Sequence, residues 1–429
     1  MVVVPFRPFP MNGRVRRTMD KILSESIYFP CTAEDRLFPT TYGRTALLLA
    51  LQSIPVRGRE VIIPVFTCPV AVLGAVIESG GIPVFVDITL KTLNFDLHDL
   101  RRKITSHTVA IISHHYFGMA NPEVAVNDHI ARKHGLVHIE DCAHSLGAEF
   151  KGSPVGKTGD LAVYSLSKNM ISPQGGLLRC NSDRLIEKVK TLYNQYPAGK
   201  IQSFFANVEF FIFFCRLMIT RKLFTSVNTR FKPNVLPYHV PSLLYMPFRL
   251  ADIFLKTQRS SGRFYSIGRE DILKSPVAVI VKMTGFQRYI IRRRIRRLHH
   301  MNVKRRNIAK RLDRIVSHFF RQGKEQRFVY TYYILFTYDK ARVLSLAKKA
   351  SILLTETWPV RGIYWREQNT TNVETIKEGA LLMNISPYWS EKELRQVEDF
   401  LDTHKGLFLN SNGEKIPDAR LDNDKTVSP

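Results

Sequence analysis

A lysine at the end of an apolar run is the first residue that could do chemistry. Lys168 follows Leu161-Ala-Val-Tyr-Ser-Leu-Ser, and a Gly-Gly pair stands seven residues further on. A lysine that leaves a buried strand must have its ammonium group neutralised or paired, because an isolated buried charge is costly. A desolvated lysine can lose its proton and act as a nucleophile. An isolated lysine more often simply emerges into solvent, so the interpretation depends on its neighbours.

Two further features upstream fit such a nucleophile. Asp141 ends the apolar run Leu136-Val-His-Ile-Glu-Asp, and Tyr42-Gly-Arg-Thr-Ala-Leu begins a helix-like stretch. A carboxylate at a strand end often caps the next turn, but it can also pair with a pyridinium nitrogen and keep it protonated. A helix start with free N–H groups and a positive dipole end suits a phosphate. Lysine, aspartate and helix start together predict a pyridoxal phosphate site.

The elements that must position these residues alternate from about residue 40 to 200. Apolar, β-rich runs separated by helix-like stretches predict an α/β fold with a mostly parallel sheet, whose strand ends share one rim. The predicted strands are Val61–Phe66, Ile82–Val86, Val109–His115, Leu136–Asp141, Leu161–Leu166 and Leu177–Cys180. The predicted helices lie near 44–53, 69–79, 122–134 and 183–194.

The remaining chain predicts further units. Phe328–Phe336 and Leu381–Ile385 are expected to be strands, Lys340–Ala350 a helix, and Ser390 with Glu393 a capping box at a final helix. We therefore expect a large domain followed by a small C-terminal α/β domain. The expected units are an N-terminal arm (1–37), a large domain (38–200), a hydrophobic insertion (201–247), a helical linker with the small domain (248–404) and a polar tail (405–429).

Charge and composition indicate which kind of partner the chain binds. The chain of 429 residues carries 63 Lys and Arg against 37 Asp and Glu, a formal charge of +26, which implies an anionic partner. The arginine-rich stretch 288–306 is either a solvated helix or a site for anionic lipid or nucleotide phosphate. No nucleic-acid-binding module is found, so nucleic acid is not expected. The apolar segment 203–224 is either a buried helix or an in-plane membrane anchor.

The five cysteines are widely spaced and include no CxxC pair. This spacing argues against a disulfide framework and against a zinc site, and it fits a reducing cytosol. The chain also lacks an uninterrupted apolar run of about 18 residues, so a membrane-spanning helix is not expected. We therefore expect no metal and a cytoplasmic location, with peripheral contact at the inner face of the membrane if 203–224 is an anchor.

The sequence resembles the nucleotide-sugar aminotransferases of the DegT/StrS type. The resemblance is continuous from about Phe38 to Cys180 and weaker over the small domain. It rests on six ordered motifs: Gly-Arg-Glu-Val-Ile-Ile-Pro-Val-Phe-Thr (58–67), Gly-Ile-Pro-Val-Phe-Val-Asp-Ile from residue 81, Thr-Leu-Asn-Phe-Asp from 92, His-Tyr-Phe-Gly from 115, His-Gly-Leu-Val-His-Ile-Glu-Asp-Cys-Ala-His from 134, and 156–160. The resemblance implies pyridoxal phosphate transferase fold type I, like aspartate aminotransferase.

The resemblance also implies roles for individual residues. Lys168 would form the internal aldimine, Asp141 would bind the pyridine nitrogen, and His144 would lie beside the ring and its 3-hydroxyl. The resemblance places three residues, Gly43, Arg44 and Ser165, at the phosphate. Cys68 takes the position of a residue that commonly stacks on the ring.

The sequence departs from the family pattern in several places. Cys68 cannot stack like an aromatic side chain, Gln174 replaces a glutamate, and the asparagine that a partner subunit would donate is absent near 265–275. Two residues are also missing between Ser165 and Lys168 relative to the commoner motif. The prediction is nevertheless an aminotransferase that converts a keto-sugar, carried on a nucleotide, into an amino sugar for a surface glycan or secondary metabolite. Glutamate is the implied donor and a homodimer the implied assembly. The alternative is a degenerate homologue that acts as a membrane-associated scaffold or regulator.

Overall fold

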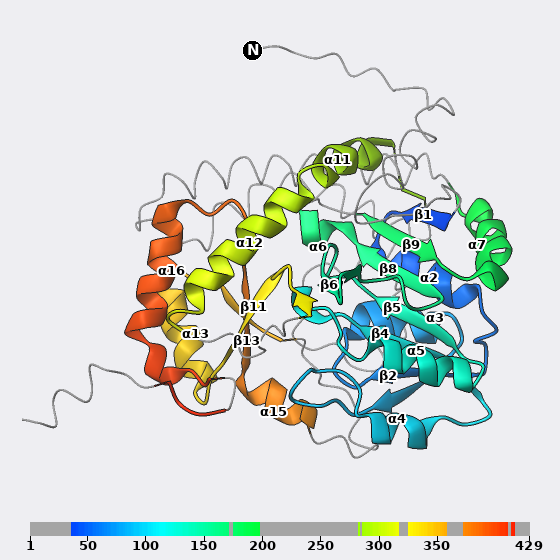
Figure 1. Ribbon diagram of the computed structural model, residues 1–429, viewed down its shortest axis with the longest axis horizontal. Coiled ribbons are helices and arrows are strands. Elements are labelled where there is room, and N and C mark those ends of the chain that lie inside the picture. The colour runs from blue at the N-terminus through cyan, green and yellow to red at the C-terminus, as the bar shows by residue number, and fades with distance from the viewer. Residues whose placement is uncertain are drawn as a thin grey trace, which may run out of the picture.

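The computed structural model describes residues 36–170, 175–197, 282–283, 285–316, 325–357, 372–410 and 413–416, which form two units joined by a helical bridge (Figure 1). The predictions for 1–35, for the hydrophobic segment 203–224, for 265–275 and for Gln174 lie outside these residues. The predicted domain boundaries stay a prediction.

A sheet of seven strands forms the centre of the larger unit. The order is β1 (Leu37–Thr40), β9 (Gly176–Cys180), β8 (Leu161–Ser165), β5 (Val137–Asp141), β4 (Thr108–His114), β2 (Glu60–Pro64) and β3 (Ile82–Val86). Strands β8, β5, β4, β2 and β3 are mutually parallel, and β9 runs antiparallel between β8 and β1. The predicted mostly parallel sheet is therefore confirmed.

Helices cover this sheet and explain why its strands are continuously apolar. They are α2 (Gly43–Gln52), α3 (Gly74–Glu78) after a π-helical turn (Pro69–Leu73), α4 (Leu97–Lys103), α5 (Val124–Lys133) and α7 (Asp183–Gln195). Helix α2 is apolar around most of its circumference, and all residues from Thr45 to Leu51 are buried. It packs against β8 and β9 and so fixes its N-terminus close to the end of β8.

The smaller unit contains an antiparallel sheet of three strands. Its order is β11 (Tyr332–Phe336), β13 (Ala380–Asn384) and β12 (Leu354–Glu356), flanked by α13 (Lys340–Lys349), α15 (Asn372–Gly379) and α16 (Glu391–Thr403). The predicted capping box at Ser390 and Glu393 is present at the start of α16. A further small sheet joins β10 (Gln326–Arg327) to β6 (Glu149–Phe150) and β7 (Ser153–Pro154), so it ties the two units together.

The predicted strand Phe328–Phe336 begins later than expected, at Tyr332. The residues before it pack on the larger unit instead: the N–H of Val329 donates to the carbonyl of Gly118 at 2.8 Å, and Tyr330 has a φ of 45°. Gly118 is required at this crossing because a Cβ there would lie 2.6 Å from the backbone nitrogen of Thr331.

The bridge between the units is a pair of helices, α11 (Gly285–Ile295) and α12 (Leu298–Leu312) (Figure 1). The sequence predicts one helical stretch over about 276–316, and within its described part, 285–316, this helix is interrupted at Arg296 and Arg297. Of the two interpretations of the arginine-rich stretch 288–306, the solvated helix does not hold for Arg288 and Arg305, which are only 6% and 2% exposed.

Candidate active site

The carboxyl ends of the parallel strands and the N-terminus of α2 surround a cavity of about 270 Å³. This is the edge at which ligands bind in such sheets. All the residues that the sequence proposed for a site lie on its wall, although they come from four separate stretches of the chain. They are Gly43, Arg44, Cys68, Asp141, His144, Ser165 and Lys168.

Lys168 lies in a short helix, α6 (Leu166–Met170), directly after β8. Its Nζ is 2.7 Å from Nε2 of His144, which belongs to the loop after the neighbouring strand β5. Burial, and then the positive charge of Lys168, hold the pKa of the His144 imidazole well below its usual range. His144 is therefore neutral at physiological pH.

Two aromatic residues that the sequence analysis missed hold the His144 ring in place. Phe117 stacks on it with ring centroids 5.5 Å apart and an interplanar angle of 16°, and the backbone N–H of Phe117 donates to Nδ1 at 3.4 Å. Tyr332 meets the same ring edge-on at 5.4 Å. Phe117 has a φ of 55°, a left-handed conformation that is rare for a bulky residue and that often marks a functional site.

Asp141 is held from two sides. Its Oδ2 accepts a hydrogen bond from His114 Nδ1 at 3.1 Å, and its Oδ1 accepts one from the N–H of Ala143 at 3.0 Å. Burial alone would raise the pKa of Asp141, but these hydrogen bonds and the charges of His114 and Lys168 lower it to about 2. The sequence analysis missed His114, although it is the next-to-last residue of the predicted strand Val109–His115.

The start of α2 offers a second binding region. Its first residue follows Tyr42, which is in an extended conformation and whose side chain does not cap the helix. The first N–H groups of a helix have no intrahelical acceptor. Gly43 packs closely on β8, because a Cβ there would lie 3.1 Å from Cβ of Ser165. Nε of Arg44 is buried without a hydrogen-bond partner among the described residues. The helix N-terminus and this buried Nε, beside the close contact of Gly43, form a suitable cradle for a phosphate.

The Gly-Gly pair after Lys168 is explained by close approach of the backbone. A Cβ on Gly176 would lie 2.0 Å from the carbonyl oxygen of Tyr42, and Gly175 has a φ of 136°. The N–H of Gly175 donates to the carbonyl of Thr41 at 2.8 Å, and its carbonyl accepts from the N–H of Leu166 at 2.9 Å. The two glycines therefore join the start of α2 to the turn that carries Lys168.

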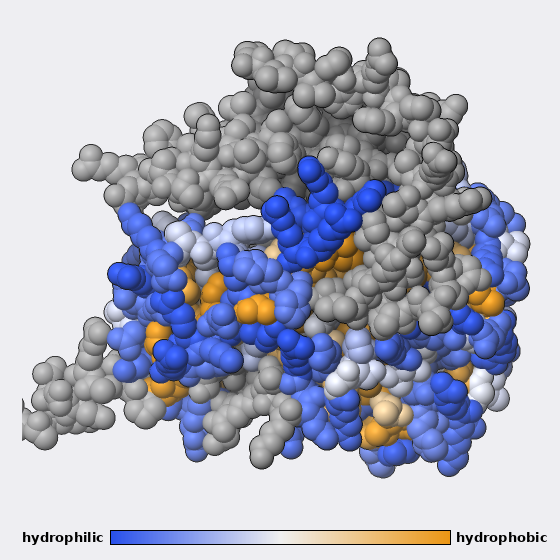
Figure 2. Space-filling model, turned by 45° about the horizontal axis from the view of Figure 1, so that its top comes forward, coloured by the Kyte–Doolittle hydropathy of each residue, from blue (hydrophilic) through white to orange (hydrophobic). Residues whose placement is uncertain are grey.

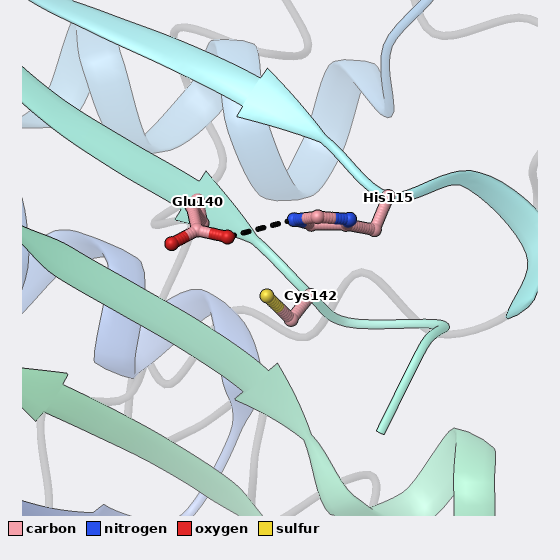
Figure 3. A group of neighbouring side chains, drawn as sticks. All are labelled: His115, Glu140 and Cys142. Carbon is pink, nitrogen blue, oxygen red and sulfur yellow. Dashed lines mark hydrogen bonds and ion pairs between the residues drawn. The ribbon is translucent and has the colours of Figure 1, made fainter. Parts of the chain in front are cut away.

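One group of described residues has the composition of a metal site (Figure 3). Ligand atoms of His115, Glu140 and Cys142 lie within 4.8 Å of one another. However, the two ring nitrogens of His115 already bond to Glu140 at 2.9 Å and to the N–H of Asn121 at 2.9 Å. Burial, and then the negative charge of Glu140, raise the pKa of the Cys142 thiol well above its usual range. We interpret the group as a structural hydrogen-bond cluster.

The carboxylate of Glu140 has a further structural task. It accepts hydrogen bonds from the backbone N–H groups of Gly156 (2.9 Å), Thr158 (2.7 Å) and Gly159 (2.6 Å). Burial opposes ionisation, but the hydrogen bond and charge of His115, the charge of His138 and the N–H of Gly159 lower the pKa of Glu140 to about 2. Glu140 therefore fixes the loop before β8, and it does so as a buried anion.

Comparison with known proteins identifies the class that this fold and cavity define. Residues 38–209 match the model of the DegT/DnrJ/EryC1/StrS aminotransferase family. This match over part of the chain confirms the resemblance found in the sequence. Members of the family use pyridoxal phosphate, and the donors, lysine and carboxylate around the cavity fit that group.

Individual relatives extend the comparison. The GDP-perosamine synthase of Vibrio cholerae is 37% identical over 162 residues, which are 37% of this chain and 44% of that protein. The chain thus spans less than half the length of this relative. The sugar aminotransferase CalS13 of Micromonospora echinospora superimposes with a TM-score of 0.64 at 17% identity, covering 92% of each chain. NtdA of Bacillus subtilis, solved with bound cofactor PMP, gives 0.62 at 17% identity, covering 91% of this chain and 77% of that one.

These superpositions establish the fold of the described chain. It is fold type I of the pyridoxal-phosphate-dependent transferases, as expected. Among the described residues, none of the helices combines the length and the apolar character needed to cross a membrane.

Proposed function

We propose that the protein is a pyridoxal-phosphate-dependent aminotransferase that converts a keto-sugar, linked to a nucleotide, into an amino sugar. The observation that carries this proposal is the convergence of Lys168, Asp141 and the start of α2 on one cavity. The names of similar proteins, including a dTDP-3-amino-3,6-dideoxy-galactopyranose transaminase 35% identical over 171 residues, support the substrate class. The same convergence argues against a degenerate scaffold, because a scaffold has no need for it.

When bound, pyridoxal phosphate supplies an aldehyde for the amino group and a protonated ring that accepts electrons from the substrate carbon. Asp141, with a pKa of about 2, stays ionised at neutral pH and would hold the ring nitrogen. The start of α2 would bind the phosphate. Lys168 is the amine placed to move a proton at the reacting carbon, with the neutral imidazole of His144 2.7 Å from its Nζ.

The decisive test compares Lys168→Ala with Lys157→Ala. Lys157 is an exposed lysine of the same unit and serves as the matched control. The wild-type protein and Lys157→Ala should absorb in the visible after incubation with pyridoxal phosphate, and borohydride should fix the cofactor to the peptide that contains Lys168. Lys168→Ala should give no such adduct. A wild-type protein that takes up no cofactor contradicts the proposal.

The amino donor and the assembly are part of the same proposal. Glutamate should discharge the visible band of the loaded protein in a half-reaction, whereas a degenerate homologue would keep the band unchanged. We further propose a homodimer in the cytoplasm. The three described cysteines, Cys68, Cys142 and Cys180, are free thiols, which supports a reducing compartment.

We also propose that the helical bridge, α11 and α12, makes a peripheral contact with an anionic membrane. Residues 285–312 contain no acidic residue, and Arg293, Arg296 and Arg297 are exposed. Figure 2 shows strongly hydrophilic side chains gathered where α11 lies. Replacement of these three arginines by glutamine should reduce sedimentation with phosphatidylglycerol vesicles. Sedimentation equal to that with phosphatidylcholine vesicles would contradict the contact.

A further inference from the structure

Among the described residues, Arg305 in α12 is one of the largest side chains that are fully buried. Burial lowers the pKa of its guanidinium to about 10, so it remains a cation at neutral pH. Its three hydrogen bonds go to neutral oxygens: the carbonyl of Asn169 at 2.9 Å, Oδ1 of Asn302 at 3.0 Å and the carbonyl of Ile385 at 3.3 Å. No carboxylate among the described residues forms an ion pair with it. A buried charge without a counter-ion is expensive, so its position calls for an explanation.

The strongest of these contacts leads directly to the proposed active site. Asn169 follows Lys168 in α6, and its side chain is fully buried. Its Nδ2 donates to the carbonyls of Ser165 (3.0 Å) and Ala143 (2.9 Å), and its Oδ1 accepts from the N–H of Leu146 (3.2 Å). Asn169 therefore connects the turn that carries Lys168 to the loop that carries His144.

A second residue from the C-terminal half holds the same two segments. The hydroxyl of Thr331, which is 2% exposed, donates to the carbonyl of His144 at 2.5 Å and lies 3.4 Å from Oδ1 of Asn169. The next residue, Tyr332, contacts the ring of His144. Asn302 of α12 adds a hydrogen bond from Nδ2 to the carbonyl of Leu146 at 3.2 Å. The turn that carries Lys168 and the loop that carries His144 are thus held by α12 and by the residues at the start of β11.

We propose that Arg305 and Thr331 are positioning residues that lock the Lys168 turn to the His144 loop and so set the approach of Nζ to Nε2. The cation of Arg305 lies at the carboxyl end of α6, where the last carbonyl groups have no intrahelical donor and where a positive charge is stabilised. The proposal rests on the proposed function for its catalytic consequence, but the network itself is independent of a bound cofactor.

The test uses paired substitutions in the full chain. Arg305→Met removes the cation, whereas Arg305→Lys keeps it but can satisfy fewer of the three oxygens. Thr331→Val removes only the hydroxyl, and Thr331→Ser keeps it. Lys304→Met, at an exposed neighbour on α12, is the control. After loading with pyridoxal phosphate, the single-turnover rate with glutamate should fall about 10-fold to 100-fold in Arg305→Met and Thr331→Val. It should recover at least partly in Arg305→Lys and Thr331→Ser and stay within about twofold in Lys304→Met.

Two further measurements separate positioning from stability. The visible circular dichroism of the bound cofactor should weaken in Arg305→Met and in Thr331→Val. The spectra are recorded at a temperature at which both variants are folded, as urea denaturation at that temperature establishes. A loss of stability with an unchanged rate and an unchanged spectrum would overturn the proposal. If Arg305→Met does not fold, the comparison of Thr331→Val with Thr331→Ser decides, and equal rates for these two overturn it.

The outcome also distinguishes this inference from the proposed function. Hydrogen exchange at the Leu146 amide, whose acceptor is Asn169, can be followed without cofactor. It should accelerate in Thr331→Val and not in Thr331→Ser. If the wild-type protein binds no pyridoxal phosphate, the proposed function fails, while faster exchange still supports the network. Unchanged exchange overturns the network itself.

Discussion

His114 and Asp141 are directly opposite each other as the last residues of two paired parallel strands, β4 and β5. The imidazole donates from Nδ1 to Oδ2 of Asp141 at 3.1 Å, and its Nε2 lies 2.7 Å from the hydroxyl oxygen of Thr67. The strand register therefore orients the carboxylate before any ligand is present. A ligand that binds through a protonated ring nitrogen meets an acceptor that needs no reorganisation, which is the condition for effective electrostatic stabilisation.

Replacing His114 should make cofactor binding more sensitive to acid. In His114→Phe the carboxylate loses its hydrogen-bond donor, so the pKa of Asp141 should rise by about one unit or more. The pH at which the loaded protein releases pyridoxal phosphate should rise with it. His114→Asn, which can still donate to Asp141, is the matched control and should restore much of the wild-type profile. Absorbance titration after gel filtration measures both, and identical acid limbs for the two variants would contradict this role.

Glu140 should account for a large part of the stability between mildly acidic and neutral pH. Its folded-state pKa of about 2 lies below the unfolded value of about 4.3, so its contribution is complete above that value and disappears as the pH falls through 2. The difference corresponds to about 3 kcal/mol. Glu140→Gln should lower the free energy of unfolding at pH 7 by that order and flatten its dependence between pH 4 and 2. Urea denaturation at several pH values measures this.

Glu149→Gln provides the control for Glu140. Glu149 is only partly buried, and its ion pair with Arg327 at 3.1 Å is largely exposed. Such pairs contribute about 1 kcal/mol or less. A similar loss of stability in both variants would show that the buried cluster in Figure 3 is not what sets the acid sensitivity.

His144 should cause a loss of stability on the acid side of neutrality. The unfolded chain takes up a proton on this imidazole near pH 6.5, whereas the folded protein resists protonation until a lower pH. The unfolded state then binds more protons, so the free energy of unfolding should fall by up to about 1.4 kcal/mol per pH unit below pH 6.5. His144→Gln should remove this slope, while the exposed control His134→Gln should retain it. Equal slopes in the two variants, followed by urea denaturation from pH 7 to 5, would contradict the prediction.

Gly43→Ala should weaken binding of the phosphate end of the cofactor. The added Cβ would lie 3.1 Å from Cβ and 3.3 Å from Cα of Ser165, so the helix start must move by a few tenths of an ångström. We expect the affinity for pyridoxal phosphate to fall about fivefold. This change corresponds to the loss of roughly 1 kcal/mol of interaction between the phosphate and the helix terminus. Pyridoxal, which lacks the phosphate, is the internal control and should bind about equally to both proteins. Titration by fluorescence quenching compares them.

The parallel sheet could be predicted closely from the sequence because its strands are buried on both faces. The bounds predicted for Ile82–Val86 are those of the structure, and the ends of the other predicted strands of this sheet differ by at most two residues. The capping box at Ser390 was predictable because it is a local pattern. The carboxyl ends of parallel strands lie at one edge of a sheet, so the sequence could predict that the candidate site residues lie close together. They all line the cavity. Their roles toward the cofactor stay predictions.

The parts that escaped prediction depend on contacts between distant segments. Nothing in the sequence near Thr331 indicates that its hydroxyl reaches His144. Arg305 stands in a run of basic residues, and a pattern of charge cannot show which member of the run faces the interior. Phe117 is also hidden, because its function depends on a left-handed backbone conformation that the sequence does not encode by a glycine. Cys68 does lie on the cavity wall, although by resemblance an aromatic residue or a histidine is more common at its position.

The position of β1 has a consequence for biosynthesis. This strand pairs over Leu37–Thr40 with β9, which comes about 140 residues later in the chain. Strand β1 therefore cannot pair with β9 until Cys180 has left the ribosome, so Leu37–Thr40 stay unpaired while the intervening residues are synthesised. Such long-range closure slows folding. Force-sensitive arrest peptides placed along the nascent chain should report a late step of tightening only after β9 has left the exit tunnel.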